Sequence, residues 1–310
     1  MILAGLAALV GVALLLDGEY LRRALRYVAE NPLALTAAFG AYTGAFALRA
    51  LAWRPLIPCP IPRLRLLSLL LAALFLNHVA PGKAGDFARM YGISKRGVSG
   101  AEAAASVVLA RLADLVGLLV VLTGAWALTG GAQWGPVTAP AAAIATMALV
   151  LWSLARLRRT PKLGPLTKPV AKLQAALRET RPRALVTAFL WATPAWVLEA
   201  GVVIFVARAL GLDISLSGTV VATCFAVLFQ ILPLTPGGLG TYEAGMVFAL
   251  VALGVPPEPA FAAAVASHAL KFLYSFAAAP FAAYEGLAAT QARKTYHPKE
   301  VDNREISVEV

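Results

Sequence analysis

The fold is decided by the stretch Asn77-His78-Val79-Ala80-Pro81-Gly82-Lys83-Ala84-Gly85-Asp86-Phe87-Ala88-Arg89, which interrupts an otherwise strongly apolar part of the chain. Lipid does not tolerate a broken backbone or a charge unless protein or a wet cavity surrounds it. A second break follows in the other half of the chain, at Pro233-Leu234-Thr235-Pro236-Gly237-Gly238-Leu239-Gly240-Thr241-Tyr242-Glu243. We interpret the two breaks as matching halves of one membrane-embedded site.

The composition indicates a membrane protein. The chain has 310 residues, of which 60% are hydrophobic and 14% charged, and its mean hydropathy is +0.75. A soluble domain is about 45–50% apolar and about 25% charged. Cys59 and Cys224 have no metal or redox spacing, and we expect no disulfide between them. The sequence therefore predicts an all-α polytopic membrane protein with a single transmembrane domain over residues 1–290.

The net charge of +11 is concentrated in connecting segments. Lys and Arg in loops set topology, because they stay on the cytoplasmic side. They also attract anionic lipid headgroups, and both interpretations stay open. Residues 156–183 carry the densest basic run, part of which has the spacing of a surface helix. Residues 17–31 predict an interfacial helix, and residues 54–65 a basic loop without regular structure.

Apolar runs predict six full spans. The basic segment 156–183 is taken as cytoplasmic, and the sides of the other loops are counted from it. Residues 66–88 must then start and end on the same side of the membrane, and so must residues 219–253. We interpret the two segments as re-entrant hairpins that enter from opposite faces. Both termini are then cytoplasmic. One half covers about 33–155 and the other about 184–288, and residues 291–310 form a cytoplasmic tail. The predicted spans are 2–16, 33–53, 103–128, 137–154, 184–209 and 260–287.

The two halves share a pattern. Each hairpin turns at Pro-Gly-x-x-Gly, at positions 81–85 and 236–240. Each turn is followed by a span with polar residues at i and i+3, which are Arg111 and Asp114 in one half and His268 and Lys271 in the other. Inverted repeats with broken helices that meet at the midplane are typical of transporters.

The breaks supply groups suited to an anion. Half-helices that begin inside a membrane present unpaired N–H groups, and Lys and Arg add cationic donors for phosphate. The glycines let the backbone approach a ligand closely. The candidate substrate-binding residues are Asn77, Pro81, Gly82, Lys83, Gly85, Asp86, Arg89, Arg111, Asp114, Gln230, Pro236, Gly237, Gly238, Gly240, Thr241, Tyr242, Glu243, His268 and Lys271.

Plainer interpretations compete with this one. Pro81-Gly82 could be an ordinary turn, with Lys83 extending to the membrane surface. Arg111 and Asp114 share one helix face and could form a structural ion pair. His268 could carry a proton or be a hydrogen-bonded core residue. Arg49 and Arg208 lie near span ends and are interpreted as anchors.

No catalytic pattern is recognisable. The chain has no defensible Ser-His-Asp arrangement, no Cys/His metal spacing and no nucleotide-binding glycine-rich loop. We therefore predict no catalytic residue, no metal and no cofactor.

At these residues the chain resembles the lysylphosphatidylglycerol synthase transmembrane-region family. The likeness rests on Asn77…Pro81…Gly85-Asp86…Arg89, on Arg111-x-x-Asp114, and on Pro233…Pro236-Gly237-Gly238-Leu239-Gly240…Glu243. That family includes the flippase half of the bacterial multiple peptide resistance factor and stand-alone proteins linked to hopanoid and archaeal lipid-glycan pathways.

The chain departs from the family in two places. The family usually has Glu at the position of Asp86, and often Glu-Arg at the position of Ala110-Arg111. The chain ends about twenty residues after its last predicted span, without the aminoacyl-transferase domain of fused members. We therefore expect that this chain alone does not synthesise lysyl-phosphatidylglycerol.

The resemblance implies a lipid flippase of the cell inner membrane. Its cargo would carry an anionic or phosphate-bearing headgroup, as in aminoacyl-phosphatidylglycerol or a polyprenyl-phosphate sugar, and a synthase or glycosyltransferase is a possible partner. Two rivals stay open. One is a membrane-embedded enzyme that acts on lipid headgroups, with Asp86, Glu243 and His268 as acid–base groups; the other is a scaffold that recruits a synthase. No nucleic-acid partner is expected.

Overall fold

The computed structural model describes residues 18–80, 84–130, 167–231 and 235–295, with isolated positions at 138, 145 and 164. Within these ranges all regular structure is helical. Among the described residues, four segments are long and apolar enough to cross a membrane: Pro32–Leu56, Gly100–Leu128, Pro182–Leu210 and Pro257–Leu287. They match four predicted spans. The other two, 2–16 and 137–154, fall almost entirely outside the described residues, so the count of six stays a prediction.

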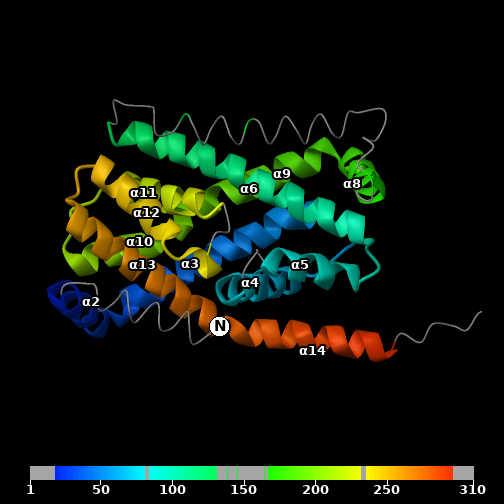
Figure 1. Ribbon diagram of the computed structural model, residues 1–310, viewed down its shortest axis with the longest axis horizontal. Coiled ribbons are helices and arrows are strands. Elements are labelled where there is room, and N and C mark those ends of the chain that lie inside the picture. Colours follow the sequence, from blue (N-terminus) through cyan, green and yellow to red (C-terminus); the bar gives the residue numbers. More distant parts are fainter. Residues whose placement is uncertain are drawn as a thin grey trace, which may run out of the picture.

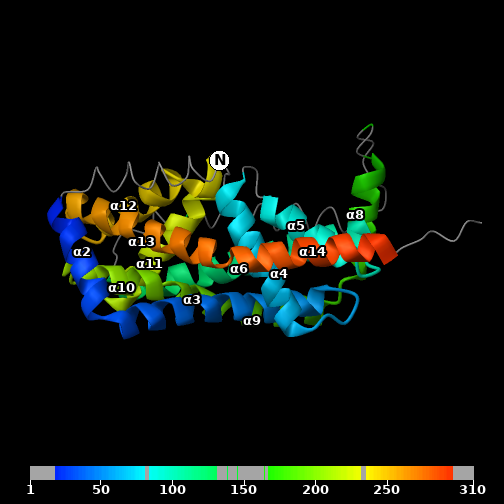
Figure 2. The same cartoon turned by 90° about the horizontal axis from the view of Figure 1, so that it is seen from below.

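The long helices run along the long axis of the molecule (Figures 1 and 2). They are α3 (Pro32–Trp53), α6 (Gly100–Leu128), α9 (Pro182–Glu199) with α10 (Gly201–Leu210), and α13 (Pro257–Ala277) with α14 (Ala279–Thr295). The sequence sets where they begin. Helices α3, α9 and α13 each have a proline in the first turn, where no backbone donor is lost. Helix α6 begins with a capping box between Ser99 and Glu102.

The first break joins two short helices, α4 (Arg63–Val79) and α5 (Ala84–Ser94), which pack against each other. The contact is close because a Cβ at Gly85 would lie 2.2 Å from the carbonyl oxygen of Ala73. The expectation of an irregular loop over 54–65 is wrong at both ends. Residues Arg54–Leu56 form a 3-10 turn, η1, and α4 already begins at Arg63.

The second break joins α11 (Leu216–Phe229) to α12 (Thr241–Ala252), with the 3-10 turn η3 (Pro236–Gly238) between them. These helices also pack against each other at a glycine, since a Cβ at Gly245 would lie 2.5 Å from the carbonyl oxygen of Phe225. Small residues allow such close approach between helices in membranes. Both breaks therefore produce the same local unit, a pair of short helices in glycine-to-backbone contact.

The two helix pairs lie in opposite halves of the molecule, and both views agree on this (Figures 1 and 2). They meet near the middle, where η3 contacts α4. The predicted surface helices are present as α2 (Gly18–Glu30), which packs against α10, and α8 (Thr167–Glu179), which packs against α6. Helix α14 continues to Thr295, past residue 290 where the predicted tail begins.

Candidate functional site

A cavity of about 480 Å³ lies where the two helix pairs meet. Its walls come from α3, α4, α5, α6, α9, α11, α12, α13 and the second break. Many of the residues that the sequence singled out converge here although they are far apart in the chain. Those that line the cavity are Asn77, Asp86, Arg89, Arg111, Asp114, Gln230, Gly237, Gly238, Tyr242, His268 and Lys271.

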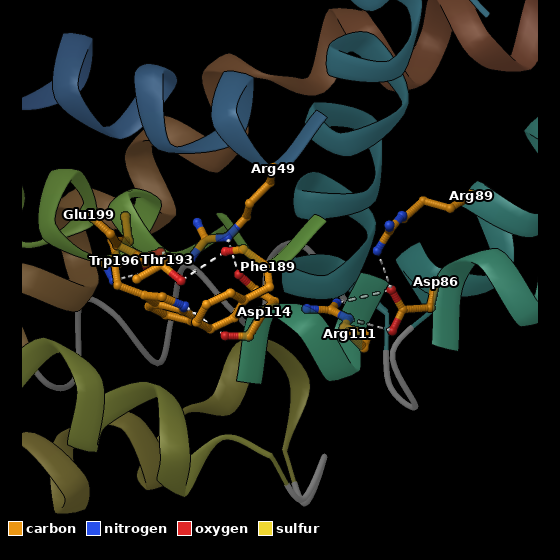
Figure 3. Close-up of polar contacts among 10 residues, drawn as sticks. Arg49, Asp86, Arg89, Arg111, Asp114, Phe189, Thr193, Trp196 and Glu199 are labelled. Atoms are coloured by element: carbon orange, nitrogen blue, oxygen red, sulfur yellow. Dashed lines mark hydrogen bonds and ion pairs between the residues drawn. The ribbon is translucent and has the colours of Figure 1, made fainter. Parts of the chain in front are cut away.

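Asp86 holds two arginines on one side of the cavity (Figure 3). Arg111 binds it through both carboxylate oxygens, with Nε 3.2 Å from Oδ2 and Nη2 3.0 Å from Oδ1. Arg89 donates Nη1 to Oδ1 at 3.3 Å, and its guanidinium lies 4.1 Å from the centre of the Trp53 ring. Forked guanidinium–carboxylate contacts fix orientation as well as charge, so this carboxylate positions α5 against α6.

A second ionic network crosses the cavity wall from α3 to α13. Arg49 donates Nε to Asp114 Oδ1 at 3.1 Å, and its Nη2 lies 2.7 Å from Glu199 Oε2. Lys271 donates Nζ to the other Glu199 oxygen at 2.7 Å. Trp196 packs under Arg49 with its ring centre 4.3 Å from the guanidinium carbon, and its Nε1 donates to the Asp114 carbonyl. The charges are therefore paired, as buried charges must be.

This network corrects two interpretations of the sequence. Arg111 and Asp114 do not pair with each other, because Arg111 binds Asp86 and Asp114 binds Arg49. Arg49 is not a membrane anchor, because only 12% of its side chain is exposed and it contacts two carboxylates. In the sequence, Arg49 is a lone arginine near the end of an apolar helix. This pattern does not indicate partners as distant in the chain as Asp114 and Glu199. Glu199 was recognisable only as a charge inside a span.

The second break is held by hydrogen bonds to its own backbone. Gly237 has φ +66°, and its carbonyl accepts from Gln230 Nε2 at 3.0 Å. His268 Nε2 lies 3.1 Å from the same oxygen, and its Nδ1 lies 2.7 Å from Glu243 Oε1. The other Glu243 oxygen accepts from the N–H of Gly240 at 2.7 Å. Both ring nitrogens of His268 therefore face acceptor oxygens, one on Glu243 and one on the backbone of the turn.

The first break is braced in a similar way, because Asn77 Oδ1 accepts from the N–H of Gly85 at 2.9 Å. The two breaks also touch, because α4 contacts η3. On α13, Phe272 and His268 lie with their ring centres 4.6 Å and 6.5 Å from that of His78. In each pair an amide side chain at the end of the first helix therefore binds the backbone that follows, and the two ends meet at one place.

The remaining predicted residues have other positions. Gly85, Glu243 and Thr241 do not line the cavity but make contacts that hold the breaks; Thr241 Oγ1 donates to the Gly238 carbonyl at 2.9 Å. Pro236 and Gly240 belong to the second turn and are not in the lining. Pro81, Gly82 and Lys83 lie outside the described residues.

The cavity has an excess of positive charge. Among the residues that the structure describes, its lining contains Arg49, Arg89, Arg111 and Lys271 against Asp86, Asp114 and Glu199. In that same part of the chain no cluster of His, Cys, Asp and Glu could hold a metal ion. Cys59 and Cys224 are both free, as expected. The arrangement suits the binding of an anion, because an excess cation in a partly enclosed site is compensated by one.

Comparisons with known proteins found a family match and a partial match to a curated relative. The family model described as "Lysylphosphatidylglycerol synthase TM region" matches residues 1–279. A curated relative, the glycosyltransferase AglD of Haloferax volcanii, is 41% identical over 81 residues, which cover 24% of this chain and 13% of that relative. The match thus spans a small part of that protein. No solved structure matches the chain.

Proposed function

Because this chain belongs to the lysylphosphatidylglycerol synthase transmembrane-region family, we propose that it is a flippase. Its substrate is a lipid with an anionic or phosphate-bearing headgroup, which it moves between leaflets. The family and the apolar helices establish a multi-pass membrane protein with a lipid-related role. Lipid translocation is the step that the proposal adds.

The observation that carries the proposal is the cation-rich cavity at the junction of the two helix pairs. Its volume of about 480 Å³ is within the usual range of ligand sites, roughly 300–1,000 Å³. Four basic side chains and three carboxylates line it within the described ranges. A headgroup phosphate would compensate the excess, while the tails stay in the surrounding lipid.

The lengths of the paired helices support the assignment of both pairs as re-entrant hairpins. Helix α4 has 17 residues and α5 has 11, so at 1.5 Å per residue they are about 26 and 17 Å long. Helices α11 and α12 have 14 and 12 residues, or about 21 and 18 Å. None reaches the roughly 30 Å of a bilayer core. We therefore assign the pairs as re-entrant hairpins of an inverted repeat, entering from opposite faces of the cell inner membrane, with both termini cytoplasmic.

Two cargoes fit the same chemistry, aminoacyl-phosphatidylglycerol and polyprenyl-phosphate sugars, because both present a phosphodiester next to a polar group. The relative AglD bears the name of a glycosyltransferase, which favours testing the sugar lipid beside the aminoacyl lipid. A synthase or glycosyltransferase that makes the lipid would be the partner of this chain.

The test is lipid exchange in proteoliposomes. Aminoacyl-phosphatidylglycerol is placed in the inner leaflet, and its arrival outside is measured with a membrane-impermeant amine reagent. The sugar lipid is followed in parallel with an impermeant glycosidase. We expect the full chain to raise the exchange rate of at least one cargo and Arg111→Ala to reduce that rate at least tenfold.

Arg208→Ala is the matched control, since Arg208 is exposed on α10 and does not line the cavity. It should exchange lipid at the rate of the unchanged protein. Equal exchange with and without protein for both cargoes would contradict the proposal. A chemically altered lipid recovered after incubation would replace it with the enzyme hypothesis.

A further inference from the structure

The four cations of the cavity differ sharply in exposure. The side chains of Lys271, Arg89 and Arg49 are 4%, 5% and 12% exposed, and each is packed against an aromatic ring as well as a carboxylate. Arg111 is 43% exposed, and no such ring contact is found for it within the described residues. A ligand that enters the cavity can therefore reach Arg111 first without moving a packed side chain.

The carboxylate of Asp86 occupies two guanidinium donors of Arg111. This carboxylate is 15% exposed and accepts from Arg111 through both oxygens, while Arg89 shares Oδ1. Guanidinium groups bind carboxylate and phosphate with the same planar, two-point geometry. Asp86 thus presents to the two arginines the pattern that a phosphate group would present.

A small cavity and an unused N–H donor lie next to the contact between Asp86 and Arg111. A smaller cavity of about 30 Å³ is lined by Arg89, Arg111, Arg49 and Asp114, among others. That volume accommodates one water-sized group. The Nε of Arg89 is buried and has no hydrogen-bond partner among the described residues. An oxygen in this position could accept from Arg89 Nε, which the Asp86 carboxylate leaves unused.

We infer that Asp86 is an internal competitor that occupies the place of the headgroup phosphate between Arg89 and Arg111 and leaves when the phosphate binds. The inference rests on the proposed function, since it concerns the same cavity. The phosphate forms the two-point contact with Arg111, and one of its oxygens accepts from Arg89. The exchange keeps both guanidiniums paired with an anion at every stage, as buried cations require.

The exchange between Asp86 and the phosphate also limits the affinity of the protein for the lipid. Binding must be strong enough for entry and weak enough for release when a substrate passes through a membrane site. A carboxylate that competes for the same donors lowers the net gain on binding and returns to them when the lipid leaves. Removing the competing charge should tighten binding and slow release.

The experiment uses the full chain in detergent, with phosphatidylglycerol as the probe and diacylglycerol as its phosphate-free control. Asp86→Asn should bind phosphatidylglycerol about tenfold more tightly than the unchanged protein and exchange lipid several-fold more slowly in proteoliposomes. Asp86→Glu keeps the charge and should behave like the unchanged protein in both assays. Equal or weaker binding by Asp86→Asn overturns the inference.

A soluble probe, sn-glycerol 1-phosphate, separates the two sources of the phosphate. Tightening for phosphatidylglycerol alone assigns the site to a lipid headgroup, and equal tightening for both assigns it to the phosphate group from either source; both results support the exchange. Asp86→Asn could also be recovered in folded form only when phosphatidylglycerol is present during purification. In that case the phosphate replaces the missing carboxylate and stabilises the fold, which supports the exchange. If the variant needs added lipid to fold, recovery that is equal with diacylglycerol, or no recovery with either lipid, overturns the inference.

The two proposals fail differently. If the unchanged protein exchanges lipid but Asp86→Asn binds no more tightly, the role of Asp86 is wrong and the flippase stands. If Asp86→Asn binds phosphatidylglycerol more tightly but no protein exchanges lipid, the phosphate site stands and the flippase is wrong.

Discussion

Lys271 and Glu199, on α13 and α9, are joined by an ion pair in which Nζ and Oε1 lie 2.7 Å apart. The second oxygen of Glu199 lies 2.7 Å from Arg49 on α3. One carboxylate therefore connects three of the long helices, and all three side chains are almost fully buried. The stability of the junction depends unequally on its members, because Glu199 contacts both cations, whereas Arg49 also binds Asp114.

Glu199→Gln should destabilise the protein more than Lys271→Met. Removing one member of a buried ion pair costs about 3–5 kcal/mol when it leaves a charge without compensation. Glu199→Gln leaves Lys271 facing a neutral amide and Arg49 with Asp114 alone, whereas Lys271→Met leaves Glu199 with Arg49. The midpoint of thermal unfolding in detergent measures the difference.

The double variant Glu199→Gln with Lys271→Met is the control for this ranking. It should be more stable than Glu199→Gln alone, because the uncompensated ammonium is gone. If Lys271→Met were the more destabilising single change, the carboxylate would not be the centre of the junction.

Gly85→Ala should separate α4 from α5. A Cβ at this position would lie 2.2 Å from the Ala73 carbonyl oxygen, which belongs to backbone and cannot rotate away. Overpacking of this kind costs about 1–3 kcal/mol. Thermal unfolding and lipid exchange should both be impaired. Gly124→Ala is the matched control, because Gly124 is exposed on α6 with open space around it; alanine there should be neutral or slightly stabilising.

Gly238→Ala should lower the free energy of unfolding by more than the strain of its backbone angle alone. Gly238 has φ +78°, and a Cβ would lie 2.2 Å from Gln230 Nε2, so Gln230 would have to release the Gly237 carbonyl. Gly97→Ala isolates the backbone effect, since Gly97 has φ +82° and nothing within 4 Å. The backbone effect alone is about 1–2 kcal/mol. Equal losses of unfolding free energy in the two variants would show that the Gln230 contact contributes nothing.

Tyr242→Phe should not lower stability. The Tyr242 hydroxyl is buried and has no hydrogen-bond partner among the described residues, and its ring stacks on His268 at 4.3 Å. Burying an unpaired hydroxyl costs about 1–3 kcal/mol, so phenylalanine should leave the unfolding midpoint unchanged or raise it. Tyr242→Ala removes the stacked ring and should lower the midpoint. A clear loss of stability in Tyr242→Phe would reveal a hydrogen bond to this hydroxyl.

Sequence patterns were sufficient for the parts of the fold that depend on local chemistry. Proline and glycine interrupt helices because of their backbone restrictions, so the ends of α4 and α11 could be predicted from the two breaks. The i, i+3 spacing of Arg111 and Asp114 placed both on one side of α6, and both line the cavity.

The pairing inside the cavity could not be predicted, because it depends on how helices are arranged in space. Arg49 finds partners on α6 and α9, and nothing near it in the sequence indicates them. The glycines were expected to admit a ligand, yet Gly85 makes room for the backbone of α4 and Gly238 for the side chain of Gln230. In both cases the space that a missing Cβ leaves is filled by the protein itself.

The carbonyl of Gly237 has a consequence for observing this protein at work. It accepts from Gln230 beyond the end of α11 and faces His268 on α13, so its two lone pairs report on two helices at once. Each hydrogen bond lowers the stretching frequency of a carbonyl. An isotope label at this single amide would make the turn a vibrational probe, whose infrared band should shift upward whenever α13 moves away from the second break.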